Sequence, residues 1–262
     1  MSTLDGWDSH LWLSKIQIQT SSDLPIFDRH GGLSHHLSPT ADAHKWRPYN
    51  YGVELILASA SPRREELLKT LRYPFRVIPG PPLDEHKILS EGGGSLPERL
   101  QELARMKGYT VARNYPDETV LSADTVVVLP GEIDLEHAEE EEYHYTAAVL
   151  EKPRDEEEAA AMLRKLSARM HHVITAVCVQ RELEGVLEQG WEVTQVYFNP
   201  LSDYMVRQYI QYEQPFDKAG AYAIQGFGAL LVSRIEGDYT NVVGLPLGLT
   251  ARLLEQSGVR VW

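Results

Sequence analysis

The chain has 262 residues, 43% of them hydrophobic, so it is long enough to bury a complete core as one large domain or as one domain with an appendage. Its net charge is −13, but residues 131–158 hold twelve acidic side chains against two basic ones, so most of the acidity is one local patch and does not argue against an anionic substrate. The absence of a basic stripe with interleaved aromatics argues against a nucleic-acid partner, and the absence of a long apolar run argues against a membrane span. We expect a cytoplasmic protein whose one cysteine, Cys178, is a buried thiol.

Residues 1–52 have the composition of an appendage. The first fifty residues hold five of the ten histidines and three of the five tryptophans, without a sustained hydrophobic period. The histidines lack cysteine partners and a metal-ligand spacing, so a polar tail is the better interpretation. We therefore predict a poorly ordered N-terminal extension, followed by one folded domain over residues 53–262.

The folded part begins with an apolar run, residues 53–58, which is typical of a strand buried on both faces. A helix is predicted to follow, with Ser61 as its N-cap and Pro62 at its first position. Its first turn carries Arg63 and Arg64, where the helix dipole is already positive and favours an anion. With Ser59 nearby, this helix start is a candidate phosphate cradle. A solvated arginine pair beside an ordinary cap is the alternative.

The next segment predicts a short strand at residues 75–78 that ends in a turn at 79–82 and the pair Asp84-Glu85. A polar loop with three glycines, residues 92–94, then leads into a second helix. Ser95 and Glu98 form the capping box of that helix. A residue seven positions after Leu100 lies on the same face, so Lys107 is expected on the buried stripe. Such a lysine either extends its ammonium group to solvent or points at a phosphate.

Residues 119–129 predict a long buried strand with Asp124 in its middle. A carboxylate in such a run is costly unless it is paired, bound to a metal, or at a functional edge. Asp124 is therefore the strongest single candidate for a functional carboxylate.

The rest of the chain alternates helices and strands. We predict an acidic loop insertion over about residues 131–145, a helix that starts at Asp155, two strands at 173–179 and 193–198 joined by a hairpin-like stretch, and a helix from Asn199 to about Ile210. Residues 217–226 are small and polar, which is typical of a functional loop. A strand near 229–235 and a final helix over 246–257 complete an α/β domain.

Seven short motifs together resemble those of Maf proteins, in the same order along the chain. They are Ser59-Ala60-Ser61-Pro62-Arg63-Arg64, Ser122-Ala123-Asp124-Thr125, Lys152-Pro153, His171 to Thr175, Asp217-Lys218-Ala219-Gly220, Ile224-Gln225-Gly226 and Asn241 to Pro246. The resemblance covers the chain from about residue 53 to its end. It implies an elongated fold like that of inosine triphosphatases, with a mixed twisted sheet and a cleft between two lobes.

The resemblance also implies a reaction. Maf proteins are nucleoside triphosphate pyrophosphatases that need a divalent metal, most often Mg²⁺, with Mn²⁺ or Co²⁺ as alternatives, and a homodimer is expected from the family. Arg63, Lys152 and Gln225 are similar to the branch that acts on dTTP and UTP, and on modified pyrimidine nucleotides. The alternative is a non-hydrolytic nucleotide-binding regulator of cell division. A P-loop and a dinucleotide-binding glycine motif are both absent from the sequence.

The candidate site residues follow from these observations. Asp124, Glu85 and Lys107 are the catalytic candidates, and Asp124 with Glu85 is the metal-binding pair, with Asp124 as base or as metal ligand. The substrate-binding candidates are Ser59, Ser61, Arg63, Arg64, Lys152, Asp217, Lys218 and Gln225. Two departures from the family pattern bear on this site. Gln214 stands where a glutamate is common, and Glu151 stands where a glycine is common.

Overall fold

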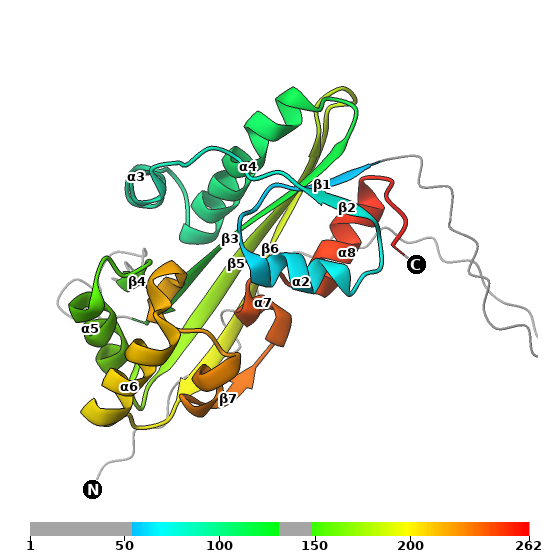
Figure 1. The fold of residues 1–262 in the computed structure, drawn as a ribbon. Coiled ribbons are helices and arrows are strands. Elements are labelled where there is room, and N and C mark those ends of the chain that lie inside the picture. Colours follow the sequence, from blue (N-terminus) through cyan, green and yellow to red (C-terminus); the bar gives the residue numbers. More distant parts are fainter. Residues whose placement is uncertain (1–53, 131–147, 262) are drawn as a thin grey trace, which may run out of the picture. The chain divides into compact units, whose positions relative to one another are not determined.

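The computed structural model describes residues 54–130 and 148–261, and within them a seven-stranded mixed sheet carries helices on both faces (Figure 1). The strands are β1 (Leu55–Leu57), β2 (Phe75–Val77), β3 (Thr119–Leu129), β4 (Ala148–Leu150), β5 (Met170–Arg181), β6 (Val186–Phe198) and β7 (Val232–Glu236). Their order is β2-β1-β3-β5-β6-β7, and β4 pairs with β3. This confirms the expected mixed sheet. The predicted extension over 1–52 and the acidic insertion over 131–145 lie outside the described residues.

The helices are α2 (Pro62–Lys69), α3 (Glu85–Glu91), α4 (Leu96–Asn114), α5 (Glu156–Leu166), α6 (Asp203–Glu213), α7 (Tyr239–Val243) and α8 (Leu247–Gln256). Three short 3₁₀ turns, η2 (Pro215–Asp217), η3 (Ala219–Ala221) and η4 (Gly226–Leu230), form the loop between α6 and β7. No helix in the described part is long and apolar enough to cross a membrane.

The long strand β3 serves both layers of the core because successive side chains point to opposite faces of a sheet. Val126 and Val128 pack with α3 and α4 on one face, which we call the α4 face. Leu121 and Ala123 pack with α2 and α8 on the opposite face, which we call the α8 face. On the α8 face a second apolar cluster, which includes Val127, lies against α5 and α6.

The edge of β3 toward β1 is interrupted. β1 pairs with β3 only as far as Leu57, which lies opposite Leu121, and β4 pairs with the same edge only from Val127 onward. Between these points, residues 122–126 have no strand partner on this edge among the described residues, whereas β5 pairs along their other edge. The consecutive residues Asp124 and Thr125, which point to opposite faces, lie in the middle of this gap.

Three expectations about local structure are corrected, and two elements are found that the sequence analysis did not predict. The polar segment that contains Glu85 is the helix α3, which begins there because Asp84 accepts the backbone N–H of Lys87. The helix expected from Asn199 begins at Asp203. The expected side-chain cap by Ser61 is not made, although α2 does begin at Pro62. The short strand β4 and the five-residue helix α7 had not been expected from the sequence.

Candidate active site

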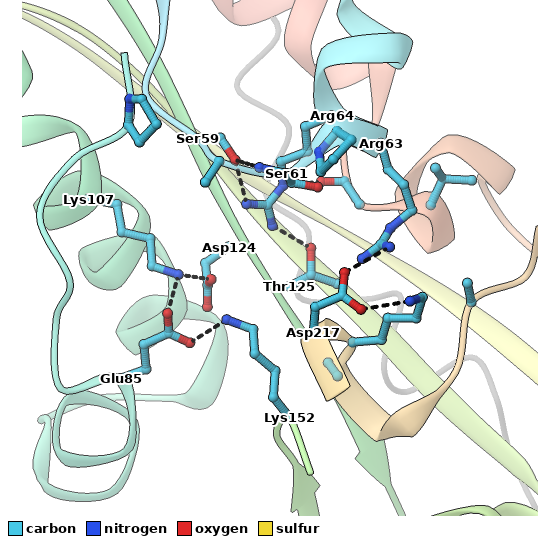
Figure 2. Close-up of a pocket in the computed structure, with 18 of the residues that line it drawn as sticks. Ser59, Ser61, Arg63, Arg64, Glu85, Lys107, Asp124, Thr125, Lys152 and Asp217 are labelled. Atoms are coloured by element: carbon cyan, nitrogen blue, oxygen red, sulfur yellow. Dashed lines mark hydrogen bonds and ion pairs between the residues drawn. The ribbon is translucent and has the colours of Figure 1, made fainter. Parts of the chain in front are cut away.

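A cavity of about 380 Å³ opens at the gap in the edge of β3 (Figure 2). Its wall takes residues from the end of β1, the start of α2, the segment before α3, β3, and the segments around Lys152 and Asp217. Every site residue predicted from the sequence lines it: Ser59, Ser61, Arg63, Arg64, Glu85, Lys107, Asp124, Lys152, Asp217, Lys218 and Gln225. The fold therefore brings together groups that are more than 160 positions apart in the chain.

One wall, which we call the lysine side, alternates carboxylates and ammonium groups. Lys107 Nζ donates to Asp124 Oδ1 and lies 2.8 Å from Glu85 Oε1. Lys152 Nζ lies 3.4 Å from Glu85 Oε2. Burial opposes ionisation of Glu85, but the charges of Lys107 and Lys152 outweigh it and hold the pKa of this carboxyl below its usual value.

The helices α3 and α4 build this lysine side. Leu100, Leu103 and Ala104 of α4 are buried against the α4 face of the sheet, which confirms the predicted stripe. Lys107 follows on the same stripe, and its side chain is only 17% exposed. The loop that contains Gly80 passes very close to the backbone of α4, because a Cβ at Gly80 would lie 2.1 Å from the carbonyl oxygen of Lys107.

The opposite wall, which we call the arginine side, holds Arg63, Arg64 and Lys218. Asp217 bridges two of these cations, with its Oδ2 3.3 Å from Arg63 Nη1 and its Oδ1 2.6 Å from Lys218 Nζ. Burial tends to raise the pKa of Asp217, but Lys218 and Arg63 lower it overall. The Asp217 side chain is 60% exposed, so this ion pair is accessible to a competing anion.

Arg64 is not a solvated side chain. Its Nε donates to the carbonyl oxygen of Gly244 at 2.8 Å, its Nη1 to Ser59 Oγ at 3.3 Å, and its Nη2 to Thr125 Oγ1 at 3.0 Å. Burial lowers the pKa of its guanidinium, and the charge of Asp124 opposes that effect. This geometry excludes the alternative of a solvated arginine pair for Arg64, because three of its five N–H groups are already held.

The balance of charge in the cavity is opposite to that of the whole chain. Among the described residues that line it, five cationic side chains, two arginines and three lysines, face three carboxylates. The chain as a whole is acidic, with a net charge of −13. A cavity with excess positive charge and several N–H donors is suited to a polyanion such as a triphosphate.

The donor set fits a divalent metal ion that shares its coordination with a substrate. The described residues contain no group of three or more His, Cys, Asp or Glu side chains able to hold a metal alone. Glu85 and Asp124 both contact the ammonium group of Lys107, so their carboxylate oxygens lie on one small region of the wall. Mg²⁺ sites of this kind use one or two carboxylates together with substrate phosphates and water.

The structure also brings residues to this site that the sequence did not single out. Thr125 and Gly244 hold Arg64, and Tyr222 lines the cavity while its hydroxyl lies 2.7 Å from His171 Nε2 in the core. Thr125 and Gly244 lie in motifs already noted, so their position beside Asp124 and Arg64 could have drawn attention to them. The hydroxyl of Tyr222 gives no such signal, because its partner is distant in the chain.

The two departures from the expected motif lie outside the cavity wall. Gln214 ends α6 in a left-handed conformation, with φ of 41°, and the neighbouring Glu213 accepts the backbone N–H of Phe227 at 3.2 Å. Glu151 Oε1 lies 3.0 Å from His86 Nδ1, next to the pair formed by Glu85 and Lys152. None of these side chains lines the cavity.

Comparison with known proteins gives a family match over nearly all of the described residues. The family model described as "Maf-like protein" matches residues 54–257. A dTTP/UTP pyrophosphatase of Koribacter versatilis is 43% identical over 211 residues, which cover 80% of this chain and 98% of the relative. The enzyme of the same name from Symbiobacterium thermophilum is 43% identical (80% and 96%), and that from Pyrococcus furiosus is 40% identical (77% and 94%).

Among solved structures, a HAM1 protein from Coxiella burnetii matches with a TM-score of 0.34 and 14% identity, over 78% of this chain and 96% of that one. A nucleoside-triphosphatase / dITP/XTP pyrophosphatase from Mycobacterium abscessus matches with a TM-score of 0.32 and 15% identity, over 56% and 73%. The order and pairing of the strands define the fold.

Proposed function

Because this chain belongs to the Maf family, we propose that it is a nucleoside triphosphate pyrophosphatase that hydrolyses dTTP and UTP to the monophosphate and pyrophosphate. The relatives that carry this name match it along nearly their whole length. The observation that carries the proposal is Asp124, a carboxylate only 5% exposed, in the wall of a cavity lined by five cations.

The cations suit the binding of the triphosphate. Arg63, Arg64 and Lys218 on the arginine side and Lys107 and Lys152 on the lysine side would neutralise the phosphate oxygens. Ser59 and Ser61 precede α2, whose N-terminal N–H groups are additional donors for an anion. Asp217 now holds Arg63 and Lys218, and a phosphate would compete with it for both.

Hydrolysis between the α- and β-phosphates needs a water molecule that attacks the α-phosphorus. Asp124 is the group proposed to orient this water and to accept its proton, or to hold a metal ion beside it. Lys107 keeps Asp124 in place through their ion pair and is itself fixed by Glu85. Lys107 would also supply positive charge to the phosphoryl oxygens of the reacting group.

We propose that the cofactor is a divalent cation, Mg²⁺ with Mn²⁺ or Co²⁺ as substitutes, and that Glu85 and Asp124 hold it. When bound, such an ion polarises a phosphoryl oxygen and lowers the pKa of a bound water. The two carboxylates supply the hard oxygen ligands that these ions prefer.

Selectivity for pyrimidines is assigned to Gln225. This residue lines the cavity beyond η3, and its side-chain amide has no hydrogen-bond partner among the described residues. An amide both donates and accepts, which suits the edge of a thymine or uracil. Modified pyrimidine nucleotides are included among the proposed substrates. We also propose that the protein is a cytoplasmic homodimer and that it removes unwanted nucleotides from the nucleotide pool.

The test is product analysis with a panel of nucleoside triphosphates in the presence of Mg²⁺, Mn²⁺ or Co²⁺. We expect dTTP and UTP to give monophosphate and pyrophosphate without a diphosphate intermediate. Diphosphate and orthophosphate as main products would overturn the proposal. Tight nucleotide binding without turnover under any of these metals would favour the alternative, a non-hydrolytic regulator of cell division.

A further inference from the structure

A group of polar side chains crosses the α8 face of the sheet between its two apolar clusters, and we call it the polar seam. It consists of Thr125 on β3, Thr175 on β5 and Thr194 on β6, together with Asn241 of α7. Thr175, Thr194 and Asn241 are completely buried. Buried hydroxyl and amide groups are costly unless they are hydrogen-bonded, so the hydrogen bonds among these side chains are needed to keep them in the core.

The direction of the hydrogen bonds in the polar seam is fixed by its two ends. The guanidinium of Arg64 can only donate, and the backbone carbonyl oxygen of Asn241 can only accept. Thr175 Oγ1 donates to this oxygen at 3.1 Å, which uses the one hydrogen of its hydroxyl. Thr125 must therefore be the donor in its 2.9 Å contact with Thr175. The Thr125 hydroxyl is left with lone pairs only, and it accepts from Arg64 Nη2.

Asn241, at the end of this chain of hydrogen bonds, is held in place by its own side chain. Its Nδ2 donates to the carbonyl oxygen of Val173 at 3.0 Å and to Thr194 Oγ1 at 2.9 Å. The same segment also supplies the carbonyl oxygen of Gly244, which accepts from Arg64 Nε. Residues 241–244 thus hold Arg64 twice, once directly and once through the two threonine hydroxyls.

From this geometry we infer that Thr175 is a positioning residue for phosphate binding, although it does not line the cavity. Its hydroxyl makes Thr125 an acceptor, and Thr125 in turn holds the guanidinium of Arg64. Two N–H groups of Arg64, one on each terminal nitrogen, have no partner among the described residues and remain for phosphate oxygens. The inference rests on the proposed function, because it assigns the polar seam to the binding of the same triphosphate.

The first test is Thr175→Val, which keeps the shape of the side chain and removes its hydroxyl. We expect the KM for dTTP and UTP to rise about 10-fold, because a hydrogen bond that fixes a charged donor is lost, while kcat changes less. Thr175→Ser restores the hydroxyl and is expected to return KM toward the wild-type value. Should the valine variant fail to fold, Thr175→Ala compared with Thr175→Ser makes the same comparison.

A matched control separates positioning from stability. Thr250 in α8 is also completely buried, and its hydroxyl donates to the carbonyl oxygen of Pro246 at 2.8 Å, away from the cavity wall. Thr250→Val removes an equivalent hydroxyl and is expected to leave KM unchanged, even where the thermal midpoint falls. A similar rise in KM for Thr250→Val would overturn the inference.

A double-mutant cycle tests whether Thr175 acts through Arg64. In the background of Arg64→Lys, which lacks the guanidinium fork, Thr175→Val is expected to add little to KM. Independent, additive effects of the two substitutions would overturn the inference. Equal KM values for wild type, Thr175→Val and Thr175→Ser would do the same.

Calorimetric binding of inorganic tripolyphosphate gives a readout that does not depend on turnover. Wild-type binding that weakens about 10-fold in Thr175→Val and recovers in Thr175→Ser supports the inference even if no nucleotide is hydrolysed, in which case only the proposed reaction fails. Hydrolysis of dTTP by the wild type, with tripolyphosphate binding unchanged in Thr175→Val, overturns the inference and leaves the proposed function intact.

Discussion

Asp124 and Thr125 contribute to the two walls of the cavity from opposite faces of one strand, and the cations beside them, Lys107 and Arg64, are held in different ways. On the lysine side, Asp124 points toward α4 and shares Lys107 with Glu85, so charged groups hold one another. On the arginine side, the neighbouring Thr125 points toward α7, and Arg64 is held by neutral oxygens of serine, threonine and backbone. A network of mutual charges can exchange partners during a reaction, whereas neutral acceptors fix an arginine without reducing its charge. The lysine side is therefore suited to chemistry and the arginine side to binding.

The largest effect is expected from a substitution on the lysine side. Asp124→Asn keeps the size of the side chain but removes the charge that takes a proton or holds a metal, and we expect kcat to fall by about 10²-fold or more. The same substitution leaves Lys107 paired with Glu85, so the protein should remain folded by circular dichroism. Near-normal turnover of the folded variant would place the catalytic carboxylate elsewhere, with Glu85 as the next candidate.

A smaller effect is expected on the arginine side, and it should appear in KM. Arg63→Gln removes one cation from the wall and is expected to raise KM for dTTP about 10-fold, as for the loss of a charged hydrogen bond, with a smaller change in kcat. Steady-state kinetics at fixed metal concentration measures both constants.

The matched control for Arg63 is Asp217→Asn. It removes the carboxylate that now occupies Arg63 and Lys218, so KM should stay the same or fall. A loss in kcat as large as that of Asp124→Asn, for either variant, would contradict the division of roles between the two walls.

A third prediction concerns the buried His171, which contacts the hydroxyl of Tyr222, a residue of the cavity wall. Burial lowers the pKa of His171 to about 3, while an unfolded chain has a histidine pKa near 6.5. Between these values only the unfolded state binds the proton, so stability is lost as the pH falls through this range. Between pH 6.5 and 4.5 we expect His171 to account for about 2–3 kcal/mol of lost unfolding free energy.

Urea unfolding at the two pH values measures this loss. His171→Gln, which cannot titrate, should reduce it. The control is His172→Gln, because His172 is only partly buried and its pKa is lowered less strongly. An equal pH dependence in wild type and His171→Gln would show that His171 does not carry the effect.

The smallest effect is expected from removal of residues 1–49. The described residues of both walls lie between Ala58 and Gly244, so we expect kcat and KM to stay unchanged. The N-terminal segment does contain Trp12, Leu13, Ile16 and Ile18, which would add stability if they covered an apolar surface. A thermal melt of the shortened chain, alongside limited proteolysis of the full chain, compares these cases. A much lower melting temperature together with lost activity would make the segment part of the fold.

The sequence predicted the elements that have a strong hydrophobic period and the charged residues that interrupt it. The strand at 119–129, the position of Asp124 within it and the buried face that carries Lys107 are confirmed. Regularly spaced apolar residues identify the buried face of an element, and a charged residue on that face indicates a candidate functional site. The same period predicted helix α4, and the spacing of Ser95 and Glu98 predicted its capping box.

The parts that were missed lack such a period or depend on pairing across strands. Helix α3 is polar and begins from a side-chain cap, and α7 has only five residues. Thr125 and Thr175 both lie in motifs noted in the sequence, but only the register of β3 and β5 places them opposite one another. Because register joins segments 50 residues apart, the polar seam could not be read from local sequence.

The pairing of β3 with β4 has a consequence for how this protein can be altered. Val127 lies opposite Leu150, so the sheet sets the spacing between Asp124 and Lys152 within three residues of the first and two of the second. The length of the chain that joins β3 to β4 does not enter that spacing. We therefore expect that a peptide tag or reporter inserted in the acidic stretch between them would leave this spacing unchanged.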